Sequence, residues 1–182
     1  MLVAVAIIVI LLAVGTPAMQ SFLQNVQIRS NAENMMSGLT LARAEAVRRN
    51  TPVTFWIVSD ITAACALSAT GNAWVVSIAS PASNCNAIAS ETNAPQLVQA
   101  RSLADSSRNV LVDGGAGNCV TFNGFGRVDA TCAGSVASPV VGIDVSSQVA
   151  PATTRALRIT VAGGGAIRVC DPAAKSSDIA AC

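Results

Sequence analysis

The opening residues of the chain are uniformly apolar, and this feature constrains the fold more than any other. From Met1 to Met19, "MLVAVAIIVILLAVGTPAM", there is no charged residue, and only Thr16 is clearly polar. A helix of about 19 residues rises about 1.5 Å per residue and is roughly 28 Å long, close to the ~30 Å hydrocarbon core of a bilayer. We therefore predict that residues 1–19 form a membrane-spanning helix.

Two other interpretations of this run stay open. A cleaved secretory signal has a basic region before its apolar core, whereas here the apolar core begins at residue 1, although Thr16 and Ala18 resemble the small residues of a cleavage site. The other interpretation is a buried core helix, but soluble domains seldom begin with a helix that is apolar on every side. The membrane helix therefore explains the pattern best.

The next segment, residues 20–50, has the pattern of an amphipathic helix. Its apolar residues recur at steps of four and three, which places them on one helix face: Ile28, Ala32, Met35, Leu39, Ala42 and Ala46. Arg48 and Arg49 favour the negative end of the helix dipole, and Thr51-Pro52 then stops the helix. We predict one continuous helix with a membrane half at 1–19 and an amphipathic half at 20–50. Proline removes a backbone donor, so Pro17 should kink it.

Residues 51–182 change to the pattern of strands. Short runs of β-branched and aromatic residues predict strands at 52–59, 73–80, 109–113, 119–122, 126–130, 156–162 and 166–170. Asn123-Gly124 predicts a hairpin with a type I′ turn, and segments 81–96 and 133–152 predict long surface connections. The predicted fold class is α+β, with a long N-terminal helix packed on an antiparallel β-sheet domain over 51–182.

Six cysteines, all downstream of the predicted helix, indicate disulfides: Cys65, Cys85, Cys119, Cys132, Cys170 and Cys182. An even number in loop-rich sequence behind a membrane segment is typical of an oxidising compartment. Many pairings are open, and buried free thiols are the alternative. The nearest-neighbour set closes short loops, and we favour Cys170–Cys182 most, because Cys182 would otherwise lie on a frayed terminus.

Composition argues against catalysis, a metal site or a cofactor. The chain has no histidine, no C-x-x-C pair and only scattered acidic residues. The absence of histidine removes the commonest general base, and a zinc site would need four cysteines from distant loops. The formal net charge is +1, so any attraction to nucleic acid must be local. We predict a protein that is not an enzyme and needs no cofactor.

The order of these parts resembles the type IV minor pilins and pseudopilins of the FimT/FimU/GspH group. Most specific are "LTLARAEAVRRNTPVTF" from Leu39 to Phe55 and "RVCDP" from Arg168 to Pro172. The resemblance implies a pilin-like fold and a structural subunit held in the bacterial inner membrane by a single pass, with its globular domain in the periplasm. It also implies partners, namely other major and minor pilins that pack against the N-terminal helix in an extracellular pilus.

The resemblance implies a minor pilin in the initiating or tip complex of the pilus. A type II secretion pseudopilin is an alternative with the same fold, although three potential disulfides fit the pilus branch better. A DNA-binding minor pilin for DNA uptake in natural transformation is the other alternative.

The sequence does not contain the residues that direct the processing of this family's members. Members carry a short basic leader, then Gly, a Phe that becomes the methylated N-terminus, and a Glu five residues into the mature chain. Placing Pro17 on the family's proline puts Met1 at the sixth mature position. We expect in-frame codons for a Gly-Phe-Thr-Leu-x-Glu-like stretch upstream of Met1, which sequencing the gene would show. A stop codon within a few residues upstream would instead favour a simple membrane-anchored protein.

Relatives that take up DNA resemble one another in a Gly-Arg-x-Arg stretch near the C-terminus. Two such arginines lie on one side of a strand, where each can meet a phosphate. The matching stretch here is "GAIR", Gly165 to Arg168, with Ala166 in place of the first arginine. The candidate DNA contacts in the last 30 residues are Arg155, Arg158, Arg168 and Lys175. We expect duplex DNA to bind weakly or not at all.

Overall fold

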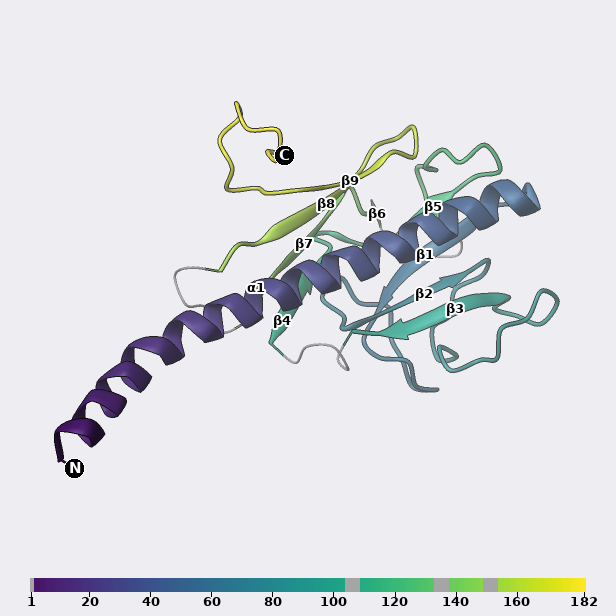
Figure 1. Ribbon diagram of the computed structural model, residues 1–182. Coiled ribbons are helices and arrows are strands. Elements are labelled where there is room, and N and C mark those ends of the chain that lie inside the picture. The colour runs from purple at the N-terminus through teal and green to yellow at the C-terminus, as the bar shows by residue number, and fades with distance from the viewer. Residues whose placement is uncertain (1, 104–108, 133–137, 149–153) are drawn as a thin grey trace.

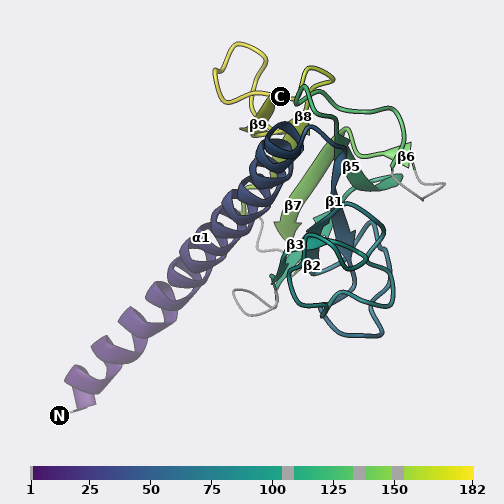
Figure 2. The same ribbon diagram turned by 90° about the vertical axis from the view of Figure 1, so that its right-hand side faces the viewer.

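The computed structural model of the chain shows one long helix lying across a domain of two β-sheets (Figure 1). The structure describes residues 2–103, 109–132, 138–148 and 154–182, and for 2–18 and 138–139 it describes the backbone without the side chains. Helix α1 spans Leu2–Arg49, so the predicted continuous helix is confirmed. Its N-terminal half extends away from the domain and its C-terminal half packs on it, as the view in Figure 2 also shows.

The strands form two sheets. The five-stranded sheet has the order β3-β2-β1-β5-β6, with β1 at Val53–Val58, β2 at Ala73–Ser77, β3 at Leu97–Ser102, β5 at Gly117–Phe122 and β6 at Ser138–Pro139. The four-stranded sheet has the order β4-β7-β8-β9, with β4 at Val110–Asp113, β7 at Gly142–Ser147, β8 at Leu157–Val161 and β9 at Ile167–Cys170. Neighbouring strands are antiparallel except for β5 with β6. The predicted α+β fold class is therefore confirmed.

The predicted apolar face of α1 forms the centre of the core. All six of its residues are buried, and they pack against both sheets. Gly38 lets the helix approach closely, because a Cβ there would lie 2.8 Å from Cε2 of Phe55 and 3.1 Å from the ring of Trp74. One helix face therefore holds both sheets in place.

Three strands lie outside the predicted strand segments. β7 and the two-residue β6 lie within 133–152, which the sequence predicted as a surface connection, and β3 follows the connection 81–96. In β7 only Ile143 and Val145 are buried, and in β3 only Leu97 is. Strands β3 and β7 contain no continuous apolar run, because most of their residues lie only partly in the core.

The chain reversal after β5 differs from the prediction. Residues 126–130 form no strand, and only Val128 makes an isolated bridge to Phe122. The two-residue type I′ turn is also wrong, because the chain turns over a wider loop, residues 123–127, in which Gly126 has the positive φ of 72°. The N–H of Asn123 donates to the Arg127 carbonyl to close this 123–127 loop. Hydrogen bonds to the Asn123 side chain, described below, hold the wider shape.

Candidate assembly surface

The part of α1 next to the domain carries an apolar stripe on its outer side. This outer stripe consists of Met19, Phe22, Leu23 and Val26, which are 49% to 63% exposed. Their spacing of three and four residues puts them on one face of the helix. At about 100° per residue, that face lies opposite the buried one that begins at Ile28. Helix α1 thus has two apolar faces, and the domain covers one of them.

The predicted membrane span falls almost entirely on residues 1–18. Among the residues whose side chains the structure describes, it contains no helix with the length and apolar character needed to cross a bilayer. The side chains of 1–18, including Pro17 with its predicted kink, lie outside that part of the chain. The span and the kink remain predictions.

The six cysteines form three disulfides, each between nearest neighbours in the sequence: Cys65–Cys85, Cys119–Cys132 and Cys170–Cys182. The first two lie in a second buried cluster with Trp56, Val75 and Leu97, on the face of the five-stranded sheet away from α1. They fasten long connections to that face. The third joins the C-terminal residue to the end of β9.

The basic residues near the C-terminus do not form a patch of four free charges. Arg158 makes a double hydrogen bond to Asp144, with Nε–Oδ1 at 2.6 Å and Nη2–Oδ2 at 2.8 Å, and this hydrogen bonding raises the pKa of Arg158. Nε of Arg155 lies 3.9 Å from Oδ2 of Asp171. Arg168 on β9 and Lys175 beyond it are exposed. Two of the four cations therefore have a carboxylate beside them, which weakens their attraction for phosphates.

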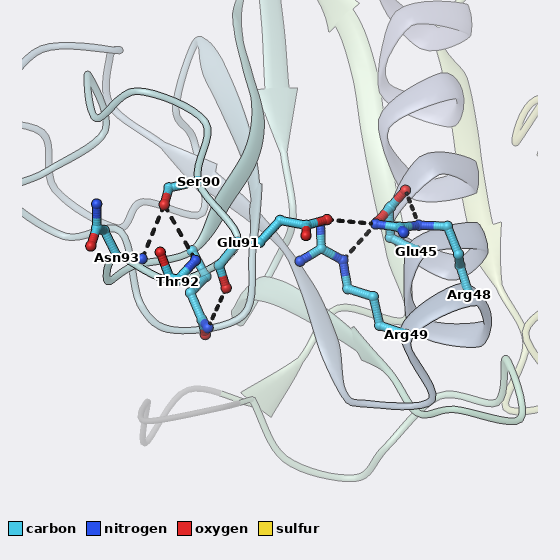
Figure 3. A network of polar contacts seen from close by, with 8 residues as sticks. Glu45, Arg48, Arg49, Ser90, Glu91, Thr92 and Asn93 are labelled. Carbon is cyan, nitrogen blue, oxygen red and sulfur yellow. Dashed lines mark hydrogen bonds and ion pairs between the residues drawn. The ribbon is translucent and has the colours of Figure 1, made fainter.

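An ion-pair network fastens the 81–96 connection to the C-terminal end of α1 (Figure 3). Glu45 accepts hydrogen bonds from Arg48 at 2.9 Å and from Arg49 at 2.7 Å. Both arginines also reach Oε1 of Glu91, at 3.1 Å and 3.5 Å. The hydrogen bonds from Arg48 and Arg49 lower the pKa of Glu45.

This network predicts a stability that depends on pH. Because the pKa of Glu45 is lower in the folded chain than its usual 4.5, its contribution is present above that value and is lost as the pH falls through the folded value. We expect Glu45→Gln to reduce the free energy of unfolding at neutral pH by about 1 kcal/mol. The difference from the parent should shrink between about pH 5 and pH 3 in urea titrations. A difference that stays constant over this range would contradict the assignment.

A cavity of about 560 Å³ lies between α1 and the C-terminal part of the domain. Its apolar lining includes Ala32, Met36, Leu157 and Val169. Its charged residues lie in pairs, with Arg29 3.0 Å from Glu33 and Arg155 3.9 Å from Asp171. The cavity therefore combines an apolar lining with charges that already compensate one another, an arrangement without the features of a catalytic centre.

Comparison with solved structures shows the same fold in a known pilin. The crystal structure of the type IV minor pilin FimU of Pseudomonas aeruginosa, strain PAO1, in space group P21 aligns with a TM-score of 0.50 and 12% identity, over 81% of this chain and 91% of that one. The same protein in space group P65 aligns with a TM-score of 0.48 and 14% identity, over 78% and 90%. No curated protein sequence matches the chain.

A comparison of this sequence with models of protein families identifies its family. The model of the family described as type II transport protein GspH matches residues 31–174, which include the buried face of α1 from Ala32 onward and both sheets. The family comprises pilin-like structural subunits, which are not enzymes. The chain therefore belongs to the GspH family of minor pilins and pseudopilins.

Proposed function

We propose that this chain is a minor type IV pilin. Residues 1–19 anchor it in the inner membrane, residues 20–50 form the amphipathic half of the helix, and residues 51–182 form a periplasmic β-rich domain. The subunit then leaves the membrane and enters the pilus through α1, where it serves in the initiating or tip complex beside other major and minor pilins.

The outer stripe of α1 is the observation that supports this proposal most strongly. Large apolar side chains that are half exposed next to a well-packed domain indicate a surface for a further partner. In a bilayer the apolar helix contacts lipid, and in a fibre the helices of neighbouring subunits can cover the same surface. Since lipid tails are as apolar as the helix, moving between these two environments costs little free energy.

Charge introduced into the outer stripe tests this role. We would replace Phe22 and Val26 together by glutamate in the full chain and measure the amount of the chain in sheared fibres. Burying two carboxylates between helices is costly, so the variant should stay folded but be lost from fibres. Ile179→Glu, at a residue that is 96% exposed in the C-terminal segment, is the matched control. Normal incorporation of the Phe22 and Val26 variant would contradict the proposal.

A type II secretion pseudopilin is the second candidate, favoured by the description of the matching family. A pseudopilin would use the same helix and the same domain. Deleting the gene separates the two functions, because loss of a minor pilin reduces surface pili, whereas loss of a pseudopilin stops the secretion of folded proteins. We expect deletion of the gene to reduce the number of surface pili and to leave the secretion of folded proteins unchanged.

DNA binding is expected to be weak. With Ala166 in the place of an arginine, and with carboxylates beside Arg155 and Arg158, few cations are left for phosphates. The domain from about residue 24 onward should bind duplex DNA with a Kd of about 10⁻⁴ M or weaker at physiological salt. A titration of labelled duplex at two salt concentrations measures this affinity.

Two substitutions complete the DNA titration. Ala166→Arg should tighten binding and steepen its salt dependence by adding one phosphate contact. Arg168→Ala should change little. Low-micromolar binding by the parent that Arg168→Ala abolishes would make DNA capture the leading function.

A further inference from the structure

An aromatic side chain protrudes from the domain near the C-terminal end of α1. Phe125, in the 123–127 loop, is 86% exposed. Loop tips are usually built from small or polar residues. The conformation of the loop therefore does not explain why a phenylalanine occupies this position. Isolated apolar residues on a surface are common, and Phe125 differs from them in how firmly its backbone is held.

The 123–127 loop is held by its own hydrogen bonds. Oδ1 of Asn123 accepts the N–H groups of Phe125 at 3.0 Å and of Arg127 at 3.1 Å. Nδ2 of the same side chain donates to Asp129 at 3.1 Å, and the N–H of Gly126 donates to the Asn123 carbonyl at 2.8 Å. The backbone on both sides of Phe125 is therefore fixed.

The loop is also clamped between α1 and the β8–β9 turn. Nε of Arg43 on α1 donates to the Gly126 carbonyl at 3.1 Å, and the N–H of Val128 donates to Gly163 at 3.0 Å. The Gly126 carbonyl packs so closely on Gly165 that a Cβ there would lie 1.9 Å from its oxygen. Elements far apart in the sequence thus fix the backbone that carries Phe125, and a side chain on a pre-organised backbone loses less entropy on binding.

The surroundings of Phe125 indicate what it binds. Val47 on α1 is 52% exposed, and its Cγ2 would lie 3.2 Å from a Cβ on Gly126, so it extends the apolar surface. Two exposed arginines lie next to Gly126, Arg43 through its hydrogen bond and Arg127 as the next residue of the loop, and among the described residues neither forms an ion pair. An apolar centre between two cations is complementary to an apolar pocket with carboxylates at its edge.

The position of this surface along α1 excludes the membrane as its partner. Val47 lies 28 residues beyond Met19, which corresponds to about 42 Å along a helix at about 1.5 Å per residue. A bilayer that ends near Met19 is out of reach. A single aromatic residue beside a valine also differs from the rows of aromatic residues on which nucleic acid bases stack.

We propose that Phe125, with Val47, Arg43 and Arg127 around it, binds a pocket of apolar residues edged by carboxylates on a neighbouring subunit of the fibre. This inference rests on the proposed function as a pilin. It adds a second assembly surface, formed by the globular domain, to the contacts made by the helix. Aromatic residues held in this way are typical of the few positions that dominate the affinity of an interface.

Site-specific photocrosslinking in the full chain tests the proposal in cells that produce its fibres. A benzophenone amino acid is placed at Phe125, at Ile88 as an equally exposed control (89%), and at Phe22 in the outer stripe. We expect the Phe125 position to crosslink to another pilin subunit, identified by mass spectrometry of sheared fibres, and the Ile88 position to give no such product. Phe125→Ala should reduce incorporation roughly thirtyfold, with an unchanged melting temperature.

The outcomes separate this inference from the proposed function. Crosslinks from Phe22 but none from Phe125, with normal incorporation of Phe125→Ala, would overturn the inference and leave the pilin function in place. Absence of the parent chain from fibres would overturn both. Phe125→Ala that weakens binding to a single-stranded oligonucleotide without affecting incorporation would show that the partner is a nucleic acid and overturn the inference.

Discussion

Replacing Leu39 by alanine is expected to lower the free energy of unfolding by about 3 kcal/mol. Leu39 is fully buried on the face of α1 that contacts both sheets. Truncating it removes apolar burial and leaves a cavity, which the neighbouring helix turns and strands cannot fill without moving. Among the residues whose side chains the structure describes, the buried core begins at Ile28, so the effect can be measured in urea on a chain that begins at residue 24.

The control for this prediction is Val26→Ala, which shortens an exposed side chain on the other face of α1. It should change the free energy of unfolding by no more than about 0.5 kcal/mol. Fluorescence of Trp74, which lies in the same cluster as Leu39, reports the transition. Equal losses of stability in both variants would contradict the assignment of a single buried face.

Removing the Cys65–Cys85 disulfide by two serine substitutions is also expected to cost about 3 kcal/mol, because it closes a loop with a sequence separation of 20. Both cysteines are buried beside Trp56, on the face of the five-stranded sheet away from α1. The connection that they hold should loosen, and water should reach Trp56. A red shift of its fluorescence in a Trp74→Phe background measures this change.

The matched comparison removes Cys170 and Cys182 in the same way. This disulfide closes a loop with a sequence separation of 12, at the end of the chain and away from both tryptophans. Its removal should lower the free energy of unfolding without shifting the fluorescence of Trp56 in the folded state. If removal of either disulfide shifts the fluorescence of Trp56 equally, the two disulfides do not act on separate parts of the domain.

The helix and its buried face were predictable, because helical periodicity depends only on the spacing of apolar residues. Asn31 shows the limit of this signal. It is 1% exposed although the periodicity places it beside the face, and its Nδ2 donates to the Gln27 carbonyl one turn earlier in the helix. A polar residue that finds its partner on its own helix can be buried without changing the apolar pattern.

Strands β3 and β7, which carry many polar residues, were not predictable from local sequence. β3 contains Gln99 and Arg101 and is the edge strand beside β2 among the strands that the structure describes, so few of its side chains need to be apolar. β7 begins with Gly142 and contains Asp144, whose partner Arg158 is set by the register with β8. Such a pair exists only once distant strands are aligned, and for this reason a count of basic residues overestimated the free charge near the C-terminus.

The surfaces proposed for assembly also depend on tertiary structure. Phe22 and Val26 have helical spacing in the sequence, but only the packed domain shows which of the two apolar faces of α1 it covers. The position of the backbone at Phe125 depends on contacts that Arg43 and Gly165, far from it in the chain, make with Gly126. A single phenylalanine next to an Asn-Gly turn signal gave no reason to expect an exposed anchor.

The most direct test of α1 as both anchor and assembly surface is quantitative mass spectrometry of membranes and sheared surface fibres from cells that produce the chain. The intact chain should remain in the membrane fraction after a carbonate wash. It should also be found in the fibres, at much lower abundance than the main subunit. Removal of residues 2–19 should release the domain from the membrane fraction and eliminate it from the fibres. An intact chain that is washed from the membrane and absent from fibres would contradict the proposed function.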